Sequence, residues 1–329
     1  MNTPSLPALP GFADVLAAAA RIAPHAHVTP VLRARSLDAI AGCTLHFKGE
    51  HLQRTGAFKF RGACNAVWSL ADADAARGVV THSSGNHGAA LALAARSRGI
   101  ACHVVVPEGA VATKLAAIAA YGATLHRCAP NLAAREAMCA EVQAHTGATL
   151  VHPYADARVI AGQGTAALEL LQQAGPLDVL VVPVGGGGLA AGTALTLAGI
   201  APRTRLLLAE PAGADDTRRS LRAGRRVDDL VPDTVCDGLR GLLGLPNFAI
   251  LAAHGQRGNA APVDVMTVDD DNAIAAMRRL LVHTKQLVEP SSAIALAAVL
   301  ADPARFAGLH VGVLLSGGNV DPDHLPWHA

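Results

Sequence analysis

Short apolar runs rich in β-branched residues alternate along the chain with Ala- and Leu-rich segments of helical period. The first series predicts strands at residues 79–82, 101–106, 124–127 and 150–152. Helices are expected between these strands, up to about residue 98, near 113–121 and at about 132–145. Because short connections that contain glycine join the segments, this β-α-β-α order predicts a parallel sheet with helices on both faces.

A second series of the same kind begins at residue 179. Its strands are expected at 179–184, 205–209, 263–268 and 311–315, and its helices after residue 188, at about 271–282 and at 291–300. The stretch 210–262 has a looser pattern, and its charged part at 215–229 is typical of a solvated surface. The chain is therefore predicted to be an α/β protein with two parallel or mixed sheets in αβα layers.

Composition and charge narrow the class of protein. A chain of 329 residues is long enough for about two domains, and 51% hydrophobic with 16% charged residues fits a compact enzyme. The net charge of +1 gives no positive field for nucleic acid or for an acidic membrane. The aromatic content of 3% also argues against base-stacking surfaces.

The sequence indicates a soluble, cytoplasmic protein. Its six scattered cysteines form no CxxC pair and are interpreted as reduced thiols. No basic segment followed by an apolar one stands at the N-terminus, so no targeting signal is expected. Residues 179–201 carry no charge, but Pro183 and the glycines after it divide them into a strand and a helix.

Lys59 lies between Phe58 and Phe60 in a segment of small and apolar residues. An amine held partly out of water has a lowered pKa and becomes a nucleophile, as a covalently reacting lysine requires. The plain alternative is a surface lysine whose stem packs on apolar residues while its amine stays in water. The choice between them depends on the loops that follow.

Three loops at the carboxyl ends of predicted strands carry candidate chemistry, because open α/β sheets bind ligands at that edge. The first, Ser83-Ser84-Gly85-Asn86-His87-Gly88, leads into a helix whose N-terminus would attract an anion such as a carboxylate. An ordinary serine N-cap is its alternative. The third, Ser316-Gly317-Gly318-Asn319, again places a hydroxyl and glycines after a strand, and could be only a turn.

The second loop, Gly185-Gly186-Gly187-Gly188, follows a strand and precedes a helix. Four glycines allow the backbone to wrap closely around a phosphate, with the helix dipole directed at it. The spacing also fits GxGxxA, and Glu210 lies 25 residues downstream, close to the position of the acidic residue in nicotinamide-binding units. An NAD-binding oxidoreductase is therefore a rival interpretation of this loop alone.

Taken together, these motifs resemble the fold-type II pyridoxal-phosphate (PLP) enzymes of the serine racemase and threonine dehydratase group, with 3-hydroxyaspartate dehydratase as a close relative. The resemblance covers nearly the whole chain. It rests on Thr29-Pro30-Val31, residues 53–63, the serine loop, residues 161–165, the four glycines, Glu210-Pro211, residues 214–216, Cys236-Asp237-Gly238, Glu289-Pro290-Ser291 and Ser316-Gly317-Gly318-Asn319. The dehydrogenase interpretation leaves Lys59 and both serine loops unexplained.

The resemblance implies a role for each matching residue. Lys59 would carry the cofactor and act as the base at Cα, and Phe58 would pack on the pyridine ring. Asn86 would donate to the ring oxygen, the loop Gly185, Gly186, Gly187 and Gly188 would hold the phosphate, and Ser316 would face the ring nitrogen. A neutral hydroxyl partner makes the ring a weaker electron sink, which favours prompt loss of a β-hydroxyl.

The expected reaction is therefore β-elimination of water from L-serine or L-threonine, giving a 2-oxo acid and ammonia. Ser84 matches the serine that exchanges a proton on the opposite face in racemases of the group, so racemisation is permitted but not required. A protein that merely binds PLP or a partner is a further alternative, but the lysine and the glycine loop are both intact.

The substrate is expected to meet Ser83, Ser84, Asn86 and His87 through its α-carboxylate. Arg135 matches a residue that faces the cleft in racemases, although a solvated helix arginine is the default. With help from Arg240 or His82, it could pair with a second carboxylate, which would make 3-hydroxyaspartate the substrate and oxaloacetate the product. Tyr154 replaces an asparagine of some racemases, and Ala89 replaces a polar residue linked to nucleotide binding there.

Glu210, Asp216 and the backbone carbonyl of Ala214 match a divalent-cation site of the family. Two carboxylates and a carbonyl suit Mg²⁺, Mn²⁺ or Ca²⁺, and a solvated acidic loop is the alternative. The resemblance also implies a homodimer. It further implies a large domain at 1–70 and 155–329, a small mobile domain at 71–154 that closes on the substrate, and no regulatory domain.

Overall fold

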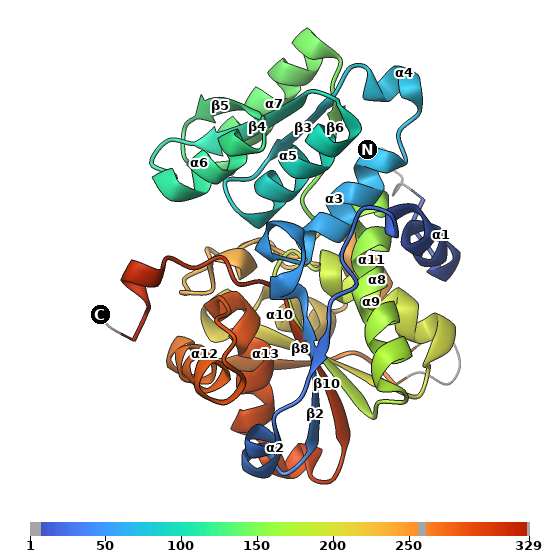
Figure 1. Ribbon diagram of the computed structural model, residues 1–329, viewed down its shortest axis with the longest axis vertical. Helices are drawn as coiled ribbons and strands as arrows, with labels where there is room; N and C mark the ends of the chain where they lie inside the picture. Colours follow the sequence, from blue (N-terminus) through green and yellow to red (C-terminus); the bar gives the residue numbers. More distant parts are fainter. Residues whose placement is uncertain (1–7, 256–260, 328–329) are drawn as a thin grey trace.

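The computed structural model describes residues 8–255 and 261–327, and places their strands in two separate sheets. The larger sheet has the order β1-β2-β10-β7-β8-β9, and the smaller has the order β5-β4-β3-β6. Figure 1 shows the smaller sheet with its helices above the larger one, and α3 (Lys59–Trp68) at the junction. The predicted α/β class with two sheets is confirmed.

The larger sheet is parallel except for its first pair of strands, which is antiparallel. Its strands are β1 (Val31–Leu32), β2 (Thr44–Gly49), β7 (Val179–Pro183), β8 (Arg205–Pro211), β9 (Asp264–Val268) and β10 (His310–Leu315). The helices α12 (Asp270–Thr284) and α13 (Pro290–Ala301) lie on one side of it, and α8 (Ala157–Ala174) and α9 (Gly188–Ile200) on the other (Figure 1).

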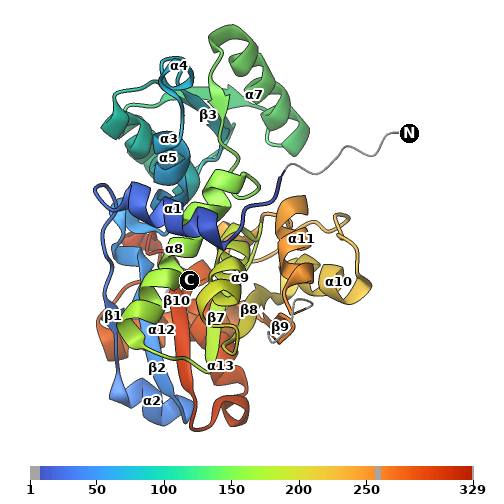
Figure 2. The same cartoon turned by 90° about the vertical axis from the view of Figure 1, so that its right-hand side faces the viewer.

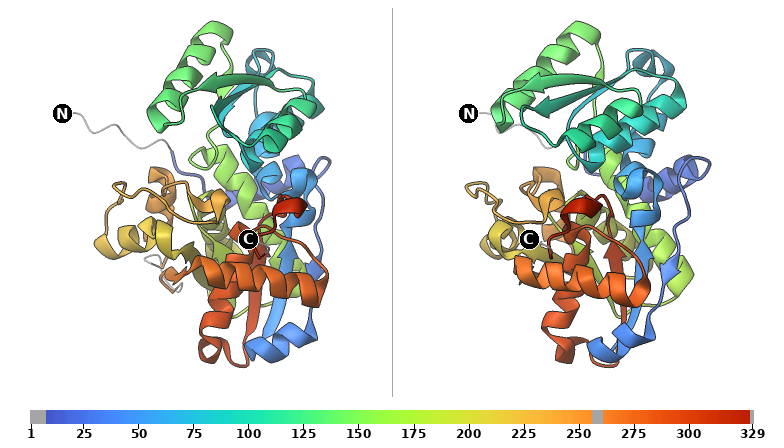
Figure 3. Two further views of the ribbon diagram at one scale, coloured as in Figure 1. Left: turned by 90° about the vertical axis from the view of Figure 1, so that its left-hand side faces the viewer. Right: turned by 60° about the vertical axis from the view of Figure 1, so that its left-hand side comes forward.

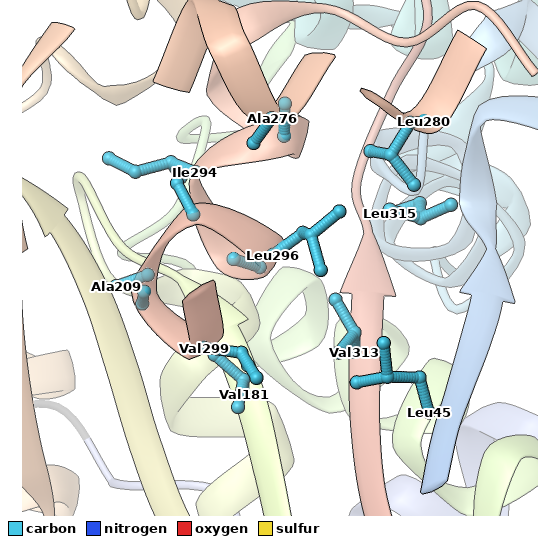
Figure 4. Close-up of a cluster of buried hydrophobic side chains, with 14 of the residues drawn as sticks. Leu45, Val181, Ala209, Ala276, Leu280, Ile294, Leu296, Val299, Val313 and Leu315 are labelled. Atoms are coloured by element: carbon cyan, nitrogen blue, oxygen red, sulfur yellow. The ribbon is translucent and has the colours of Figure 1, made fainter. Parts of the chain in front are cut away.

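Both faces of the larger sheet are buried at its central strands, which explains why β7 and β10 are apolar without alternation. Val181 and Val313 point towards α13, where Figure 4 shows them beside Leu296 and Val299. The next residues along the same strands, such as Val182 and Leu314, belong to the opposite core under α8 and α9. Successive side chains of a strand point to opposite faces, so each strand contributes to both cores.

The smaller sheet is entirely parallel. It consists of β3 (Val79–His82), β4 (Cys102–Pro107), β5 (Thr124–Cys128) and β6 (Thr149–Leu150), and its helices are α5 (Asn86–Arg98), α6 (Ala112–Ala120) and α7 (Leu132–Thr146). Figures 2 and 3 show this unit set apart from the larger sheet, with α1 (Phe12–Ile22) and α8 near the junction. All four strands lie within the segment 71–154, while the domain limits themselves stay a prediction.

Several helices fall where no periodic pattern was assigned. They include α1, α2 (Arg35–Ala41), α3, α4 (Asp72–Ala75), α8, α10 (Asp216–Ala223) and α11 (Leu245–Ala253). Two of them, α10 and α11, lie inside the stretch expected to be loose. The uncharged window 179–201 is a strand followed by the 13-residue helix α9, and none of the described helices is long and apolar enough to cross a membrane.

Candidate active site

The three candidate loops lie at strand ends, and the lysine segment joins one of them. Ser316 follows β10, and its carbonyl accepts the N–H of Phe58 at 3.0 Å. Ala57 also forms an isolated antiparallel bridge with Gly317. The segment before Lys59 is therefore tied to the carboxyl edge of the larger sheet, where the glycine loop also begins.

Lys59 does not extend its amine into water. Its Nζ donates to the backbone carbonyl of Pro153 at 3.0 Å and lies 5.1 Å from the centre of the Phe58 ring. Burial lowers the pKa of this amine to about 8, and the negative charge of Glu289 opposes that change only in part. The side chain is thus partly neutral near physiological pH, which suits a nucleophile and a base.

A hydrogen-bonded group around Asn86 spans the two units of the fold. The Asn86 amide donates to both oxygens of Glu289, at 3.0 and 3.2 Å, and its oxygen accepts from Asn319 at 2.8 Å. Burial raises the pKa of Glu289 to about 7, and its hydrogen bond with Asn86 opposes the rise. The sequence pointed to Asn86 but assigned no role to Glu289, because a carboxylate before Pro-Ser also reads as an ordinary helix start.

The four glycines are required by what lies against them. A Cβ on Gly185 would come within 2.7 Å of the backbone of Leu239, and one on Gly186 would overlap the Tyr154 ring. Gly187 has a φ of +86° and stands directly before α9. The loop therefore makes a tight turn between β7 and α9. The backbone N–H groups at the N-terminus of α9 stay free for an anion.

Glu210 does not serve as the acidic residue of a nicotinamide site. It is fully buried at the end of β8, where its carboxylate accepts the backbone N–H groups of Thr217 at 2.7 Å and Arg218 at 2.9 Å. Those groups belong to the first turn of α10. Because this carboxylate is fully buried against α10, it is not exposed to a ribose hydroxyl, and the spacing that suggested NAD is accidental.

The serine loop keeps its helix N-terminus uncapped. Gly85, not a serine, is the N-cap of α5, and no side chain caps it. The Ser83 hydroxyl makes one long contact, 3.4 Å from the N–H of Gly85, and Ser84 is half-buried. The N-cap alternative is therefore wrong, and the loop offers free hydroxyls and N–H groups beside α5.

His87 is buried, and its Nε2 lies 3.2 Å from the carbonyl of Val151. Burial, with Lys59 nearby, holds the pKa of this imidazole well below its ordinary value. On the third loop, the Ser316 hydroxyl is buried and makes only a 3.5 Å contact with the carbonyl of Ser291. That hydroxyl is largely unused by the protein.

The two arginines considered for a second carboxylate differ in their surroundings. Arg240 donates twice to the carbonyl of Thr234, at 3.0 and 2.6 Å, so its guanidinium is already occupied. Arg135 makes one 3.4 Å contact with the carbonyl of Asn131, and no salt bridge to it occurs among the described residues. Of the two, Arg135 is the arginine with hydrogen-bonding capacity to spare.

The candidate metal ligands lie close together in sequence and are buried. The Asp216 carboxylate accepts the N–H of Leu243 at 2.7 Å, and Ala214 ends the short 3₁₀ turn before it. Burial raises the pKa of Glu210 to about 8 and that of Asp216 to about 6, and Asp216 adds to the rise at Glu210. Across residues 8–255 and 261–327, no cluster of three or more His, Cys, Asp or Glu side chains is placed to hold an ion.

Comparison with known proteins identifies the family. Residues 22–317 match the family described as pyridoxal-phosphate dependent enzyme. The chain is 47% identical to a β-hydroxyaspartate dehydratase of Paracoccus denitrificans, over 97% of this chain and 99% of that protein. It is 46% identical to a serine racemase of Arabidopsis thaliana, over 92% and 90% of the two chains.

A solved structure of serine racemase from Dictyostelium discoideum superposes on this one with a TM-score of 0.89, at 43% identity over 95% of this chain and 100% of that chain. The matches extend over both sheets and all three loops. The oxidoreductase alternative is wrong. The chain belongs to the family of pyridoxal-phosphate-dependent enzymes, as the resemblance of its motifs implied, and pyridoxal phosphate is its cofactor.

Proposed function

We propose that the chain is a dehydratase of 3-hydroxy-α-amino acids, with L-serine and L-threonine as substrates, which releases a 2-oxo acid and ammonia. The observation that carries this proposal is that Lys59, with its amine held out of water, follows a segment bonded through its backbone to the strand end that carries the neutral, largely unused hydroxyl of Ser316. A lysine base beside a ring-nitrogen partner that carries no charge favours loss of a β-hydroxyl over transamination.

The residues fit the cofactor. The cradle formed by Gly185, Gly186, Gly187 and Gly188 closes against Tyr154 and Leu239 and would hold the phosphate at the N-terminus of α9. Phe58 would contact the ring, and the Asn86 amide, fixed by Glu289, would direct its second N–H at the ring oxygen. Bound pyridoxal phosphate supplies an aldehyde for the substrate amine and a ring that withdraws electrons from Cα.

The protein's own part is to position groups and move protons. Lys59 takes the proton from Cα and returns it to the β-hydroxyl, which leaves as water. The dehydrated product then adds water and loses ammonia, which gives the 2-oxo acid. The free N–H groups at the start of α5, with Ser83 and the backbone of Ser84, hold the α-carboxylate of the substrate.

A second candidate substrate is 3-hydroxyaspartate, and the observation that favours it is the guanidinium of Arg135, which forms no salt bridge with any described residue. The relative with 47% identity is a β-hydroxyaspartate dehydratase, and this likeness also supports 3-hydroxyaspartate as the substrate. The Arg135→Met variant separates the two. If the second carboxylate binds there, kcat/KM for 3-hydroxyaspartate falls about 30-fold or more while that for L-threonine changes less than about threefold. Equal changes for both would remove this candidate.

Racemisation provides a test of Ser84. Because Ser84 would act on the face opposite Lys59, Ser84→Ala is expected to abolish interconversion of L- and D-serine. Elimination from the enantiomer that Lys59 deprotonates should remain within about threefold of the unchanged enzyme. Chiral chromatography of serine, run beside an ammonia assay, measures both reactions. Equal loss of both would contradict the division of roles between Lys59 and Ser84.

We also propose a divalent cation, Mg²⁺, Mn²⁺ or Ca²⁺, bound by Glu210, Asp216 and the carbonyl of Ala214. Two buried carboxylates without a salt bridge among the described residues support it, because a cation would offset the cost of their charges. Chelation is expected to lower the melting temperature by about 4 °C or more, and added Mg²⁺ should restore it. In Glu210→Gln the chelator should have no further effect. An unchanged melting temperature for the chelated parent enzyme would remove the site.

We also propose an oligomeric state and a cellular location for the protein. A homodimer with closure of a small domain at 71–154 is expected from the family, and the six free cysteines favour a cytoplasmic protein. The cross-cleft ion pair between Lys114 of α6 and Asp237 supports closure, because its two members belong to different units. Sedimentation at several protein concentrations would measure the oligomeric state.

A further inference from the structure

Two histidines lie next to both proton-moving candidates. His82 ends β3 and stands two residues before Ser84. His152 directly precedes Pro153, whose carbonyl accepts from Lys59. The imidazole rings are 5.2 Å apart, in an edge-to-face arrangement. A ligand with its Cα between Lys59 and Ser84 therefore has this histidine pair as a neighbour.

Hydrogen bonding fixes which ring nitrogen of His152 carries the proton. Its Nδ1 accepts the backbone N–H groups of Tyr154 at 3.3 Å and Ala155 at 3.0 Å. A nitrogen that accepts two N–H groups must offer a lone pair, so the proton of the neutral ring is on Nε2. That Nε2 has no hydrogen-bond partner within the described ranges. His152 therefore presents an unused donor.

The two imidazoles are neutral in the ligand-free protein. Burial lowers the pKa of His152 to about 4, with His82 and Lys59 adding to the effect and Asp156 opposing it. Burial and then the charge of Arg135 lower the pKa of His82, while Glu136 opposes them. His87, which is also neutral, and the Tyr154 phenol, 4.6 Å from His152 between ring centres, complete the group.

We propose that His82 and His152 share one proton, taken from solvent, when a substrate with a second carboxylate binds, and that this proton uptake makes the cleft selective for dicarboxylic hydroxy amino acids. This inference rests on the proposed dehydratase function and deepens it. Arg135 supplies a fixed positive charge, and the histidine pair supplies a charge that exists only while the anion is present.

The physical argument has two parts. An anion within about 4–6 Å favours the protonated imidazole and shifts its pKa by about 1–3. The same anion cancels the effect of Arg135 on His82. Two imidazolium ions 5.2 Å apart would repel each other, so the pair accepts one proton and not two. L-Threonine brings only the α-carboxylate, which both substrates share, so the additional proton uptake is expected with the dicarboxylic substrate alone.

Calorimetry of the PLP-loaded enzyme tests this uptake with two unreactive ligands. 2-Methylaspartate and 2-aminoisobutyrate both lack the Cα hydrogen, so neither can be racemised or dehydrated, and they differ by one carboxylate. Titrations in buffers of different ionisation enthalpy give the protons taken up by each. At about pH 6.5 we expect 2-methylaspartate to take up roughly 0.5 proton more, and the difference to vanish by about pH 8.5.

Three variants test whether His82 and His152 bind the proton that is taken up. His152→Asn keeps an oxygen that can accept the N–H groups of residues 154 and 155 but cannot titrate, and His82→Gln removes the other ring. Each is expected to lower the difference in proton uptake between the two ligands at least twofold. His145→Gln removes an exposed imidazole from the last turn of α7 and should leave it unchanged. Equal uptake with both ligands in the parent enzyme, or full uptake in His152→Asn and His82→Gln, would overturn the proposal.

A kinetic readout tests the same inference with the substrates themselves. The ratio of kcat/KM for 3-hydroxyaspartate to that for L-threonine should fall about tenfold between pH 6 and 8.5, and the fall should disappear in His152→Asn. A ratio that does not change with pH in the parent enzyme would contradict the proposal. Failure of the dehydratase function itself would instead appear as no ammonia from either substrate, while the calorimetric difference would remain.

Discussion

Replacing Lys59 with alanine is expected to lower kcat for dehydration on the order of 10⁴-fold, because no other base in the described site is placed to remove the Cα proton. The three other described lysines have partners of their own, and Lys285 donates to the carbonyl of Val282. Lys48 is fully buried and donates to Glu169 and Gln173, and Lys114 pairs with Asp237. Borohydride treatment of the PLP-loaded protein should attach the pyridoxyl group to Lys59, and the variant should carry none.

The pH dependence of cofactor uptake follows from the same lysine. Its neutral amine is the reactive form, and the lowered pKa of about 8 makes that form half-populated near pH 8, not near the ordinary 10.5. The rate at which the cofactor-free protein takes up pyridoxal phosphate should therefore rise with pH and reach half its maximum near 8. A midpoint near the ordinary 10.5, or a pyridoxyl group found on another lysine, would contradict the assignment.

Replacing Arg61 with leucine is expected to destabilise the protein by about 3–5 kcal/mol, the cost of leaving the buried carboxylate of Glu50 without its charged partner. Arg61 is fully buried on α3, two residues after Lys59. It donates to both oxygens of Glu50, at 2.6 and 2.8 Å, and to both of Glu169, at 2.7 and 2.8 Å. Lys48 joins the same group through Glu169, so two cations balance two carboxylates.

Urea unfolding of the cofactor-free protein measures this loss. Arg219→Leu is the matched control, because Arg219 is 41% exposed and its pair with Asp229 is 3.2 Å long. Exposed pairs of this kind contribute about 0–1 kcal/mol. A loss for Arg61→Leu no larger than that of the control would show that α3 does not depend on this buried group.

Strands β3 to β10 were predicted, whereas β1 and β2 were not. The central strands were the clearest in the sequence, because both of their faces are buried. Strand β4, expected at 101–106, runs from Cys102 to Pro107, and β10, expected at 311–315, from His310 to Leu315. Such strands appear in the sequence as continuous apolar runs between turn residues. Parallel strands then bring their carboxyl ends to one edge, which is why loops far apart in sequence could be expected to share a site.

What could not be predicted depends on contacts between distant segments. Helix α8 buries polar residues such as Gln163 and Thr165 against α3, so its periodic pattern is obscured. The partnership of Glu289 with Asn86 joins residues 203 positions apart. Motif resemblance supplied the roles of Lys59 and the glycine loop, but the unused donor of His152 emerges only from the hydrogen bonds of its ring.

The measurement that tests the central claim most directly is the joint yield of ammonia and 2-oxo acid from the PLP-loaded enzyme. L-Serine, L-threonine and the diastereomers of 3-hydroxyaspartate are supplied separately, with Lys59→Ala as the control. We predict equimolar ammonia and 2-oxo acid from at least one of them, at a rate that Lys59→Ala reduces on the order of 10⁴-fold. Full cofactor loading without ammonia from any of these substrates would contradict the proposed dehydratase function.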